Sequence, residues 1–214
     1  MGLRNTTEKH LVYVIYMEHK LKIILVGDTN VGKTSLLQRK HNNMFNPTFT
    51  TTLGVDFYYI SVRKNNTDIK IYLWDTAGQE KFANLINVYF RDLDGAMVLY
   101  DITNRNSFDS IEKWIDKISI FNKNKTDVPI IIVGTKTDLE KHRMIHKQEI
   151  VNIAKKHKYI TIECSSKENT NIDETFDLII DKIIEHRNLT FTVEDTLEIQ
   201  EGDATITKNC CTIL

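Results

Sequence analysis

The chain has 214 residues, of which 41% are hydrophobic and 27% charged, so it is long enough to bury one well-packed domain and too short for two comfortable ones. Its net charge of -1 argues against bulk electrostatic binding to nucleic acid, and no nucleic-acid partner is expected. Three cysteines make no disulfide framework, and no apolar run approaches the roughly 20 residues that span a bilayer.

The two ends of the chain differ from its middle. Residues 1–19 form an N-terminal extension whose apolar patch at 11–16 either forms an extra strand or stays loose. The first residues fit the N-myristoylation pattern M-G-x-x-x-[ST], although a start at Met17 would remove that signal. Residues 188–214 hold five acidic side chains against Lys208, which gives this tail a charge of -4 and the remainder +3. We predict a nucleotide-binding domain at 20–187 between two flexible ends.

Between these ends, strand and helix patterns alternate. In chain order, the first half predicts a strand at 21–26, a helix at 35–40, a loop at 45–51, strands at 55–63 and 68–74 joined as a hairpin through 64–67, a loop at 75–80, a helix ending at Arg91 and a strand at 96–100. The second half predicts a helix at 107–121 capped by Asn106 or Ser107, a strand at 128–133, a helix at 146–157, a strand at 159–164 and a helix at 172–186. This order is typical of an α/β fold with a mostly parallel six-stranded sheet covered by helices on both faces.

The residues that follow the first strand fit the phosphate-binding pattern G-x-x-x-x-G-K-[ST], with the sequence Gly27-Asp28-Thr29-Asn30-Val31-Gly32-Lys33-Thr34. Its glycines let backbone N–H groups converge on one anion, where a helix N-terminus adds partial positive charge. Lys33 is expected to reach the β- and γ-phosphates, and Thr34 to offer its hydroxyl to Mg²⁺. A plain strand-to-helix turn is the alternative.

Three further polar clusters follow predicted strands, at 75–80, 134–138 and 165–167, and strand carboxyl ends are where such folds bind ligands. Asp75 is the expected second anchor of the metal, Gly78 can bring its N–H to the γ-phosphate, and Gln79 can orient an attacking water. The Asp138 carboxylate can accept from two adjacent guanine N–H groups, a pair that adenine does not offer. Thr52 is the candidate metal-coordinating hydroxyl of a mobile loop. Ordinary turns are the alternatives for 75–80 and 135–138.

These residues resemble the Ras superfamily of small GTPases, and most closely the Rab family, over about residues 20–187. Besides the motifs above, Rab character rests on the segments 53–57, 70–74, 81–86, 89–91 and 99–103. The resemblance implies the P-loop small-GTPase fold and a GTP/GDP switch with Mg²⁺ that hydrolyses GTP slowly and recruits effectors to membranes in vesicle trafficking. It further implies that Phe45 packs against the guanine and that Ser166 offers its backbone N–H to the base.

The expected site then has three sets of residues. Lys33 and Gln79 are the catalytic pair, and Thr34, Thr52 and Asp75 hold the metal. The nucleotide-binding set is Asp28, Thr29, Asn30, Val31, Gly32, Lys33, Thr34, Ser35, Phe45, Thr52, Gly78, Thr135, Lys136, Asp138, Ser165, Ser166 and Lys167. Expected partners are an exchange factor, a GTPase-activating protein and effectors at the two switches, with prenylation and membrane-extraction chaperones, and the chain is expected to be a monomer.

Several positions depart from the family pattern. Thr135 stands where most members have asparagine, so a hydroxyl with fewer hydrogen bonds replaces an amide. Ser166 replaces a usual alanine, while Leu53 and the pair Asn84-Leu85 alter the effector surface.

The tail ends Cys210-Cys211-Thr212-Ile213-Leu214, which fits C-a-a-X at Cys211 with a terminal leucine that favours geranylgeranyl. Cys210 is a candidate for a second lipid, because one chain gives only marginal membrane binding. We expect lipid anchoring on the cytoplasmic face of an intracellular membrane, with a cytosolic pool.

Three other functions compete with this interpretation. Thr29, Asn30 and Thr135 suggest a GTP-dependent scaffold without useful hydrolysis, which the presence of Gln79 opposes. An ATP-using kinase or ATPase is opposed by Asp138. A Rho-like GTPase is suggested by Thr135, but the path from Asp138 to the helix near His146 is too short for a helical insertion.

Overall fold

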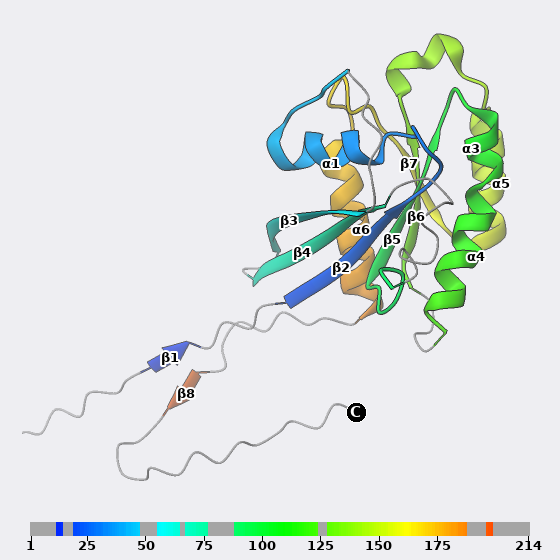
Figure 1. The fold of residues 1–214 in the computed structure, drawn as a ribbon. Coiled ribbons are helices and arrows are strands. Elements are labelled where there is room, and N and C mark those ends of the chain that lie inside the picture. Colours follow the sequence, from blue (N-terminus) through cyan, green and yellow to red (C-terminus); the bar gives the residue numbers. More distant parts are fainter. Residues whose placement is uncertain are drawn as a thin grey trace, which may run out of the picture.

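A computed structural model describes residues 12–14, 19–47, 55–64, 67–76, 88–123, 128–187 and 196–198. Its main sheet has six strands in the order β3-β4-β2-β5-β6-β7 (Figure 1). The strands are β2 His19–Val26, β3 Val55–Lys64, β4 Thr67–Thr76, β5 Gly95–Asp101, β6 Ile130–Thr135 and β7 Ile160–Glu163. Only the β3–β4 pair is antiparallel, which confirms the predicted mostly parallel sheet and its hairpin.

Helices lie on both faces of the sheet, as predicted (Figure 1). They are α1 Lys33–Asn42, α3 Arg105–Asp109, α4 Ile111–Phe121, α5 Lys147–His157 and α6 Ile172–His186, with a 3-10 helix η2 at Thr137–His142. The apolar residues of α1 and α6 share one core, and those of α3, α4 and α5 share the other. The molecule therefore has three layers.

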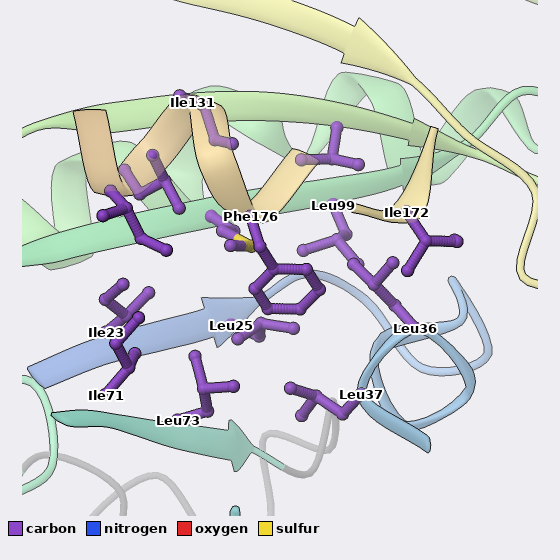
Figure 2. Close-up of a cluster of buried hydrophobic side chains, with 14 of the residues drawn as sticks. Ile23, Leu25, Leu36, Leu37, Ile71, Leu73, Leu99, Ile131, Ile172 and Phe176 are labelled. Carbon is purple, nitrogen blue, oxygen red and sulfur yellow. The ribbon is translucent and has the colours of Figure 1, made fainter. Parts of the chain in front are cut away.

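Side chains point alternately to the two faces of the sheet along each strand, and this separates the two hydrophobic cores. In β2, Leu21, Ile23 and Leu25 pack toward α1 and α6, whereas Ile24 and Val26 pack toward α3 and α4. Successive strand residues point to opposite faces, so a strand buried on both sides must be apolar throughout. Figure 2 shows Phe176 of α6 among the labelled side chains of the first core, which include Leu25, Leu73 and Leu99.

The predicted helix at 107–121 is wrong at its start. The chain forms two helices that meet at Ser110, and the first is capped by Asn104 rather than by Asn106 or Ser107. The Asn104 Oδ1 accepts hydrogen bonds from the backbone N–H groups of Asn106 and Ser107, at 3.0 and 3.4 Å. The Ser107 hydroxyl instead accepts from the Asp101 N–H at 3.0 Å, which ties α3 to the end of β5. Asn104, Asn106 and Ser107 are all residue types that cap helices, and the hydrogen bond between Ser107 and Asp101 leaves Asn104 as the cap.

Other boundaries shift by a few residues. Residues 88–92 form turns, so the predicted helix does not extend to Arg91, and the stretch 77–87 lies outside the described residues. Strand β6 begins at Ile130, after Pro129, which has no N–H to give to a sheet, and runs on through Thr135. The helix η2 was not predicted. Residues 48–51 of the predicted loop lie outside the described part.

A second, two-stranded antiparallel sheet joins the predicted extensions. Strand β1, Val12–Val14, pairs with β8, Thr196–Glu198, in the register Val12↔Glu198. The limits 20–187 stay a prediction for the central domain. Within the described residues, none of the helices combines the length and apolar character that crossing a bilayer requires.

Core packing gives a first prediction. Phe176 is fully buried between α6 and the sheet, so Phe176→Ala should lower the free energy of unfolding by about 3–5 kcal/mol through lost burial and a residual cavity. Urea unfolding measures the change. Phe57→Ala is the matched control, because Phe57 is 50% exposed and should lose far less. Equal losses in the two variants would contradict the core assignment.

Candidate nucleotide-binding site

The loop between β2 and α1 needs its glycines. Gly27 has a φ of 146°, and a Cβ there would lie 2.4 Å from the Leu99 carbonyl oxygen of β5. Gly32 has a φ of 97° and Asn30 a φ of 64°, both in the left-handed region that side chains rarely adopt. The loop thus curls tightly against the sheet before α1 begins.

The N-terminus of α1 carries no internal counter-charge. Its N-cap is Gly32, which has no side chain to accept from the first N–H groups, and its first turn has no acidic residue. Four N–H groups at a helix start lack intrahelical partners, and they carry the positive end of the helix dipole. This end of α1 is suited to an anion, as the sequence pattern predicted.

Lys33 lies inside the loop with only 6% of its surface exposed. Its Nζ donates to the carbonyl oxygens of Gly27 at 2.8 Å and Asp28 at 2.9 Å. Burial lowers the pKa of Lys33 from 10.5 to about 8, although the nearby charges of Asp75 and Asp28 oppose the shift. The loop therefore presents a partly desolvated ammonium group that an added negative charge would stabilise.

Asp75, at the end of β4, is fully buried beside this lysine. Its Oδ2 accepts a hydrogen bond from the Thr34 hydroxyl with 2.5 Å between the oxygens, while its Oδ1 has no hydrogen-bond partner among the residues that the structure describes. Burial raises the pKa of Asp75 from 3.8 to about 6, against the lowering effects of the Thr34 hydrogen bond and the Lys33 charge. Above that pH the buried carboxylate destabilises the metal-free fold, since this group's contribution to stability is lost as the pH rises through its raised pKa.

The Asp75 and Thr34 oxygens fit Mg²⁺. Both are hard donors on one side of the loop, and the unpaired Oδ1 is the kind of buried atom that a cation satisfies. Across the described ranges, no group of three or more His, Cys, Asp or Glu side chains is placed to hold a metal. The remaining ligands would thus have to come from water, from phosphate or from other parts of the chain, which is how Mg²⁺ commonly binds with phosphates.

The rim is the edge of the sheet at which its parallel strands end, and the phosphate loop lies at one end of it. At the other end, η2 lies next to the loop that follows β7. The Asp138 Oδ1 accepts from the Ser165 hydroxyl at 2.7 Å, and Lys167 Nζ lies 3.8 Å from its Oδ2. The Thr137 N–H donates to the Cys164 carbonyl at 3.2 Å. The side chain of Asp138 is 7% exposed. Two segments that are distant in sequence thus hold one carboxylate in place.

Thr135 connects the two ends of the rim. Its hydroxyl lies 2.6 Å from the Val31 carbonyl of the phosphate loop and 2.9 Å from the Tyr100 carbonyl of β5, and its single proton serves one of them at a time. Lys136 has a left-handed φ of 64°, and its Nζ forms an ion pair with Asp101 Oδ2 at 2.7 Å.

The Asp28 side chain points away from the phosphate end. Its carboxylate accepts from the Ser110 hydroxyl at 2.8 Å and from the Trp114 indole N–H at 2.9 Å. The carboxylate thus braces the loop against α4, and only its backbone faces Lys33.

The other predicted site residues divide into two groups. Thr29, Asn30 and Lys167 are exposed, Ser35 and Phe45 are half-buried, and Ser166 is buried. The rest, Thr52, Gly78, Gln79, Cys210 and Cys211, lie outside the described residues.

Sequence reasoning missed Ser110, Trp114 and Arg39, each of which supports the rim from a helix. The Arg39 side chain donates to the carbonyls of Ser166 and Lys167 across more than a hundred residues of sequence. No local sequence pattern predicts contacts between residues so far apart. The sequence does show that Arg39 is a cation in the last turn of a predicted helix. The 3-10 helix η2 ends at His142 and α5 starts at Lys147, so the predicted absence of a helical insertion is confirmed.

Comparisons with known proteins agree with this geometry. The family model described as "Ras family" matches residues 22–185. Ras-related protein Rab-10 of Diplobatis ommata is 36% identical over 191 residues, which cover 89% of this chain and 94% of the relative. Ras-related protein Rab-13 of Canis lupus familiaris is 37% identical over 74% of this chain and 77% of the relative.

A third relative, Ras-related protein Rab-2B of Dictyostelium discoideum, is 38% identical over 78% of this chain and 82% of its own length. The match spans the phosphate loop, the Asp75 segment and both base-side segments. The chain therefore belongs to the Ras family and is a Rab-type small GTPase, which binds GTP, GDP and Mg²⁺ and hydrolyses GTP.

Proposed function

We propose that the nucleotide lies along the rim with its phosphates on residues 28–35 and its base between residues 135–138 and 165–167. The observation that carries this proposal is the buried Asp75 Oδ1, which accepts no hydrogen bond within the described ranges, next to the Thr34 hydroxyl in the first turn of α1, a helix start that has no side-chain cap. A cation at this atom and an anion at the helix end would each stabilise the other. This is the arrangement that a Mg²⁺-bound phosphate chain requires.

At the phosphate end, the backbone N–H groups of residues 29–35 surround the β- and γ-phosphates, and Lys33 turns from its carbonyl partners toward them. Its lowered pKa favours this exchange, because a desolvated ammonium gains more from a phosphate than from a carbonyl. Mg²⁺ would be held by Thr34, Asp75 and Thr52, and it would supply charge neutralisation for the phosphoryl transfer.

At the base end, Asp138 accepts from the guanine edge while Ser165 fixes its orientation. Ser166 donates its backbone N–H to the base, Lys136 and Lys167 flank the ring, and Phe45 packs against it. Thr135 orders the loop beneath rather than the base itself, since its hydroxyl is already engaged with Val31 and Tyr100 carbonyls. An adenine would leave the Asp138 carboxylate without its paired donors.

Hydrolysis then acts as the switch. Gln79 orients the attacking water, and Thr52 and Gly78 hold their segments only while the γ-phosphate is present. No arginine lies within 27–34 or 75–80, so turnover without a partner should be slow. A GTPase-activating protein would accelerate hydrolysis, and an exchange factor would replace GDP.

An aromatic surface on the β3–β4 hairpin is suited to effectors. Phe57 is half exposed and packs edge-on against Trp74, with ring centroids 5.0 Å apart, and Trp74 lies 4.8 Å from Tyr89. Aromatic residues with partly exposed rings are typical of binding surfaces. In the sequence, Phe57 closely follows the first predicted switch segment and Trp74 closely precedes the second, so a partner bound to this surface would be coupled to the bound nucleotide.

The tail would place this switch on a membrane. Lipids on Cys210 and Cys211, added and chaperoned by prenylation and extraction proteins, would anchor a monomer to the cytoplasmic face of an intracellular membrane with a cytosolic pool. Two chains are needed because the acidic residues before them are repelled by anionic lipids. The role in vesicle trafficking follows from the Rab relatives.

The metal site gives a pH prediction. Mg²⁺ competes with a proton for Asp75, whose pKa is raised to about 6, so Mg²⁺ affinity of the GDP complex should fall by about tenfold per pH unit below that value. Titrating Mg²⁺ against the GDP release rate at several pH values measures this. Asp75→Asn should release GDP at a rate that hardly responds to Mg²⁺.

Asp56→Asn is the control for this titration, because Asp56 is exposed and is the cross-strand neighbour of Asp75 on β3. It should retain a response to Mg²⁺, with the pH dependence moved toward lower pH because the Asp56 charge contributes to the raised pKa of Asp75. If Asp75→Asn also retains that response, the metal is held elsewhere.

Hydrolysis gives a third prediction. Intrinsic single-turnover GTP hydrolysis should be on the order of 10⁻⁴ per second, and Gln79→Leu should slow it by about tenfold or more because the attacking water loses its orientation. Phosphate release from GTP-loaded protein measures the rate, with GDP affinity measured in parallel to exclude a folding defect. Rapid hydrolysis that Gln79→Leu leaves unchanged would rule out this role.

The lipid anchor gives a fourth prediction. Replacing both Cys210 and Cys211 by serine should move the protein from the membrane fraction to the cytosol, while each single variant retains only weak binding. Mass spectrometry of the C-terminal peptide identifies the lipids, and fractionation measures the distribution. Membrane association that survives the double replacement would show another anchor.

A further inference from the structure

Arg39 connects the helix of the phosphate loop to the loop on the base side. It lies in the last turn of α1, and its Nε donates to the Ser166 carbonyl at 2.7 Å. One terminal nitrogen donates to the Lys167 carbonyl at 3.2 Å, and the other donates to the Asn43 carbonyl at 2.8 Å. One guanidinium thus holds two successive carbonyls of the loop and the C-cap of its own helix.

The loop needs such support at its tip. Its base is closed by two backbone hydrogen bonds between Ser165 and Thr170, both 3.0 Å long. The Ser165 hydroxyl is oriented toward Asp138 and also accepts from the Glu168 N–H at 3.1 Å. Within the described contacts, the peptide carbonyls of Ser166 and Lys167 are bound by Arg39.

The chemistry requires arginine in particular. A guanidinium presents several N–H donors in a fixed plane, so binding two neighbouring carbonyls also fixes the direction of the peptide between them. A lysine ammonium at this position would hold one carbonyl without that constraint. Because the C=O of one residue and the N–H of the next lie in one plane, fixing these carbonyls also fixes the N–H groups of Lys167 and Glu168. The Glu168 N–H donates to the Ser165 hydroxyl, which in turn donates to Asp138.

We propose that Arg39 is a positioning residue for base selectivity: by holding the carbonyls of Ser166 and Lys167, it orients the peptide whose Glu168 N–H binds the Ser165 hydroxyl, and so keeps Ser165 directed at Asp138. The inference rests on the proposed function, in which Asp138 and the loop at 165–167 hold the guanine. It adds a residue from the phosphate-loop helix to the determinants of nucleotide choice. Arg39 itself does not touch the nucleotide.

The neighbouring residue provides a matched control. Lys40 lies on the same turn of α1 and also reaches across to the α6 region, where its Nζ forms an ion pair with Asp173 at 2.6 Å and lies 5.5 Å from the centre of the Phe176 ring. It therefore links α1 to α6 without contacting the loop carbonyls. Removing Lys40 tests helix packing, and removing Arg39 tests packing and loop orientation together.

The test compares the dissociation constants of GDP and ADP, measured by competition against fluorescent GDP on nucleotide-stripped, full-length protein with Mg²⁺. In Arg39→Ala, GDP affinity should fall about tenfold, corresponding to the loss of a charge-assisted hydrogen bond, while ADP affinity changes less than about twofold. Arg39→Lys should fall between wild type and Arg39→Ala. Lys40→Ala should retain the wild-type ratio.

A second control tests the contact between Arg39 and the end of its own helix separately from its contacts with the loop. Asn43 has a left-handed φ of 54°, which glycine adopts readily, so Asn43→Gly removes the Arg39–Asn43 side-chain contact without strain. The ratio should stay at the wild-type value in this variant. If Arg39→Ala weakens GDP and ADP by the same factor, or leaves both unchanged, Arg39 has no role in selectivity. A wild-type protein that binds GDP and ADP equally would instead overturn the proposed function.

Discussion

Two buried charges of opposite sign, the Lys33 ammonium and the Asp75 carboxylate, set the main constraint on this structure. Burial shifts both pKa values toward neutrality, to about 8 and about 6, so the fold holds each group in a form that an ionic ligand would stabilise. Lys33 is the first residue of α1, and Asp75 lies near the end of β4 beside Leu25 of β2. Because the second half of β2 is fully buried and apolar, the two charges lie where the helix begins and the strand ends and not in the middle of the sheet.

The rest of the rim serves to hold the loop and the base-side segments in one geometry. Helices from both layers reach it: α4 binds the Asp28 carboxylate through Ser110 and Trp114, and α1 binds the loop after β7 through Arg39. The Thr135 hydroxyl lies between these supports, beneath the phosphate loop. A hydroxyl suffices at this position because the site needs one buried donor for two alternative carbonyl acceptors.

Local patterns predicted the six strands, the long helices and the polar rim, because hydrophobic period and glycine spacing are properties of neighbouring residues. What they did not predict depends on tertiary contacts. Asn104 caps α3 because the Ser107 hydroxyl accepts from Asp101 of β5, and Asp28 faces α4 because Trp114 lies there. Motif matching placed Asp28 in the nucleotide-binding set, which stays a prediction, and it did not predict that the carboxylate supports the loop against α4. Roles that fall on Thr52, Gly78 and Gln79 rest on the sequence.

The hydrogen bonds that hold the phosphate loop and the base-side loop limit which parts of the site can move in the switch. Both the phosphate loop and the base loop are tied to helices through well-formed hydrogen bonds, so neither needs the γ-phosphate to keep its position. The Asp75 carboxylate differs, because in the part of the chain that the structure describes one of its oxygens accepts no hydrogen bond. Loss of a phosphate should therefore disturb the segment that follows Asp75 more than the base side. A rigid base site and a responsive Asp75 strand end let the protein keep GDP while its partner-binding surface changes.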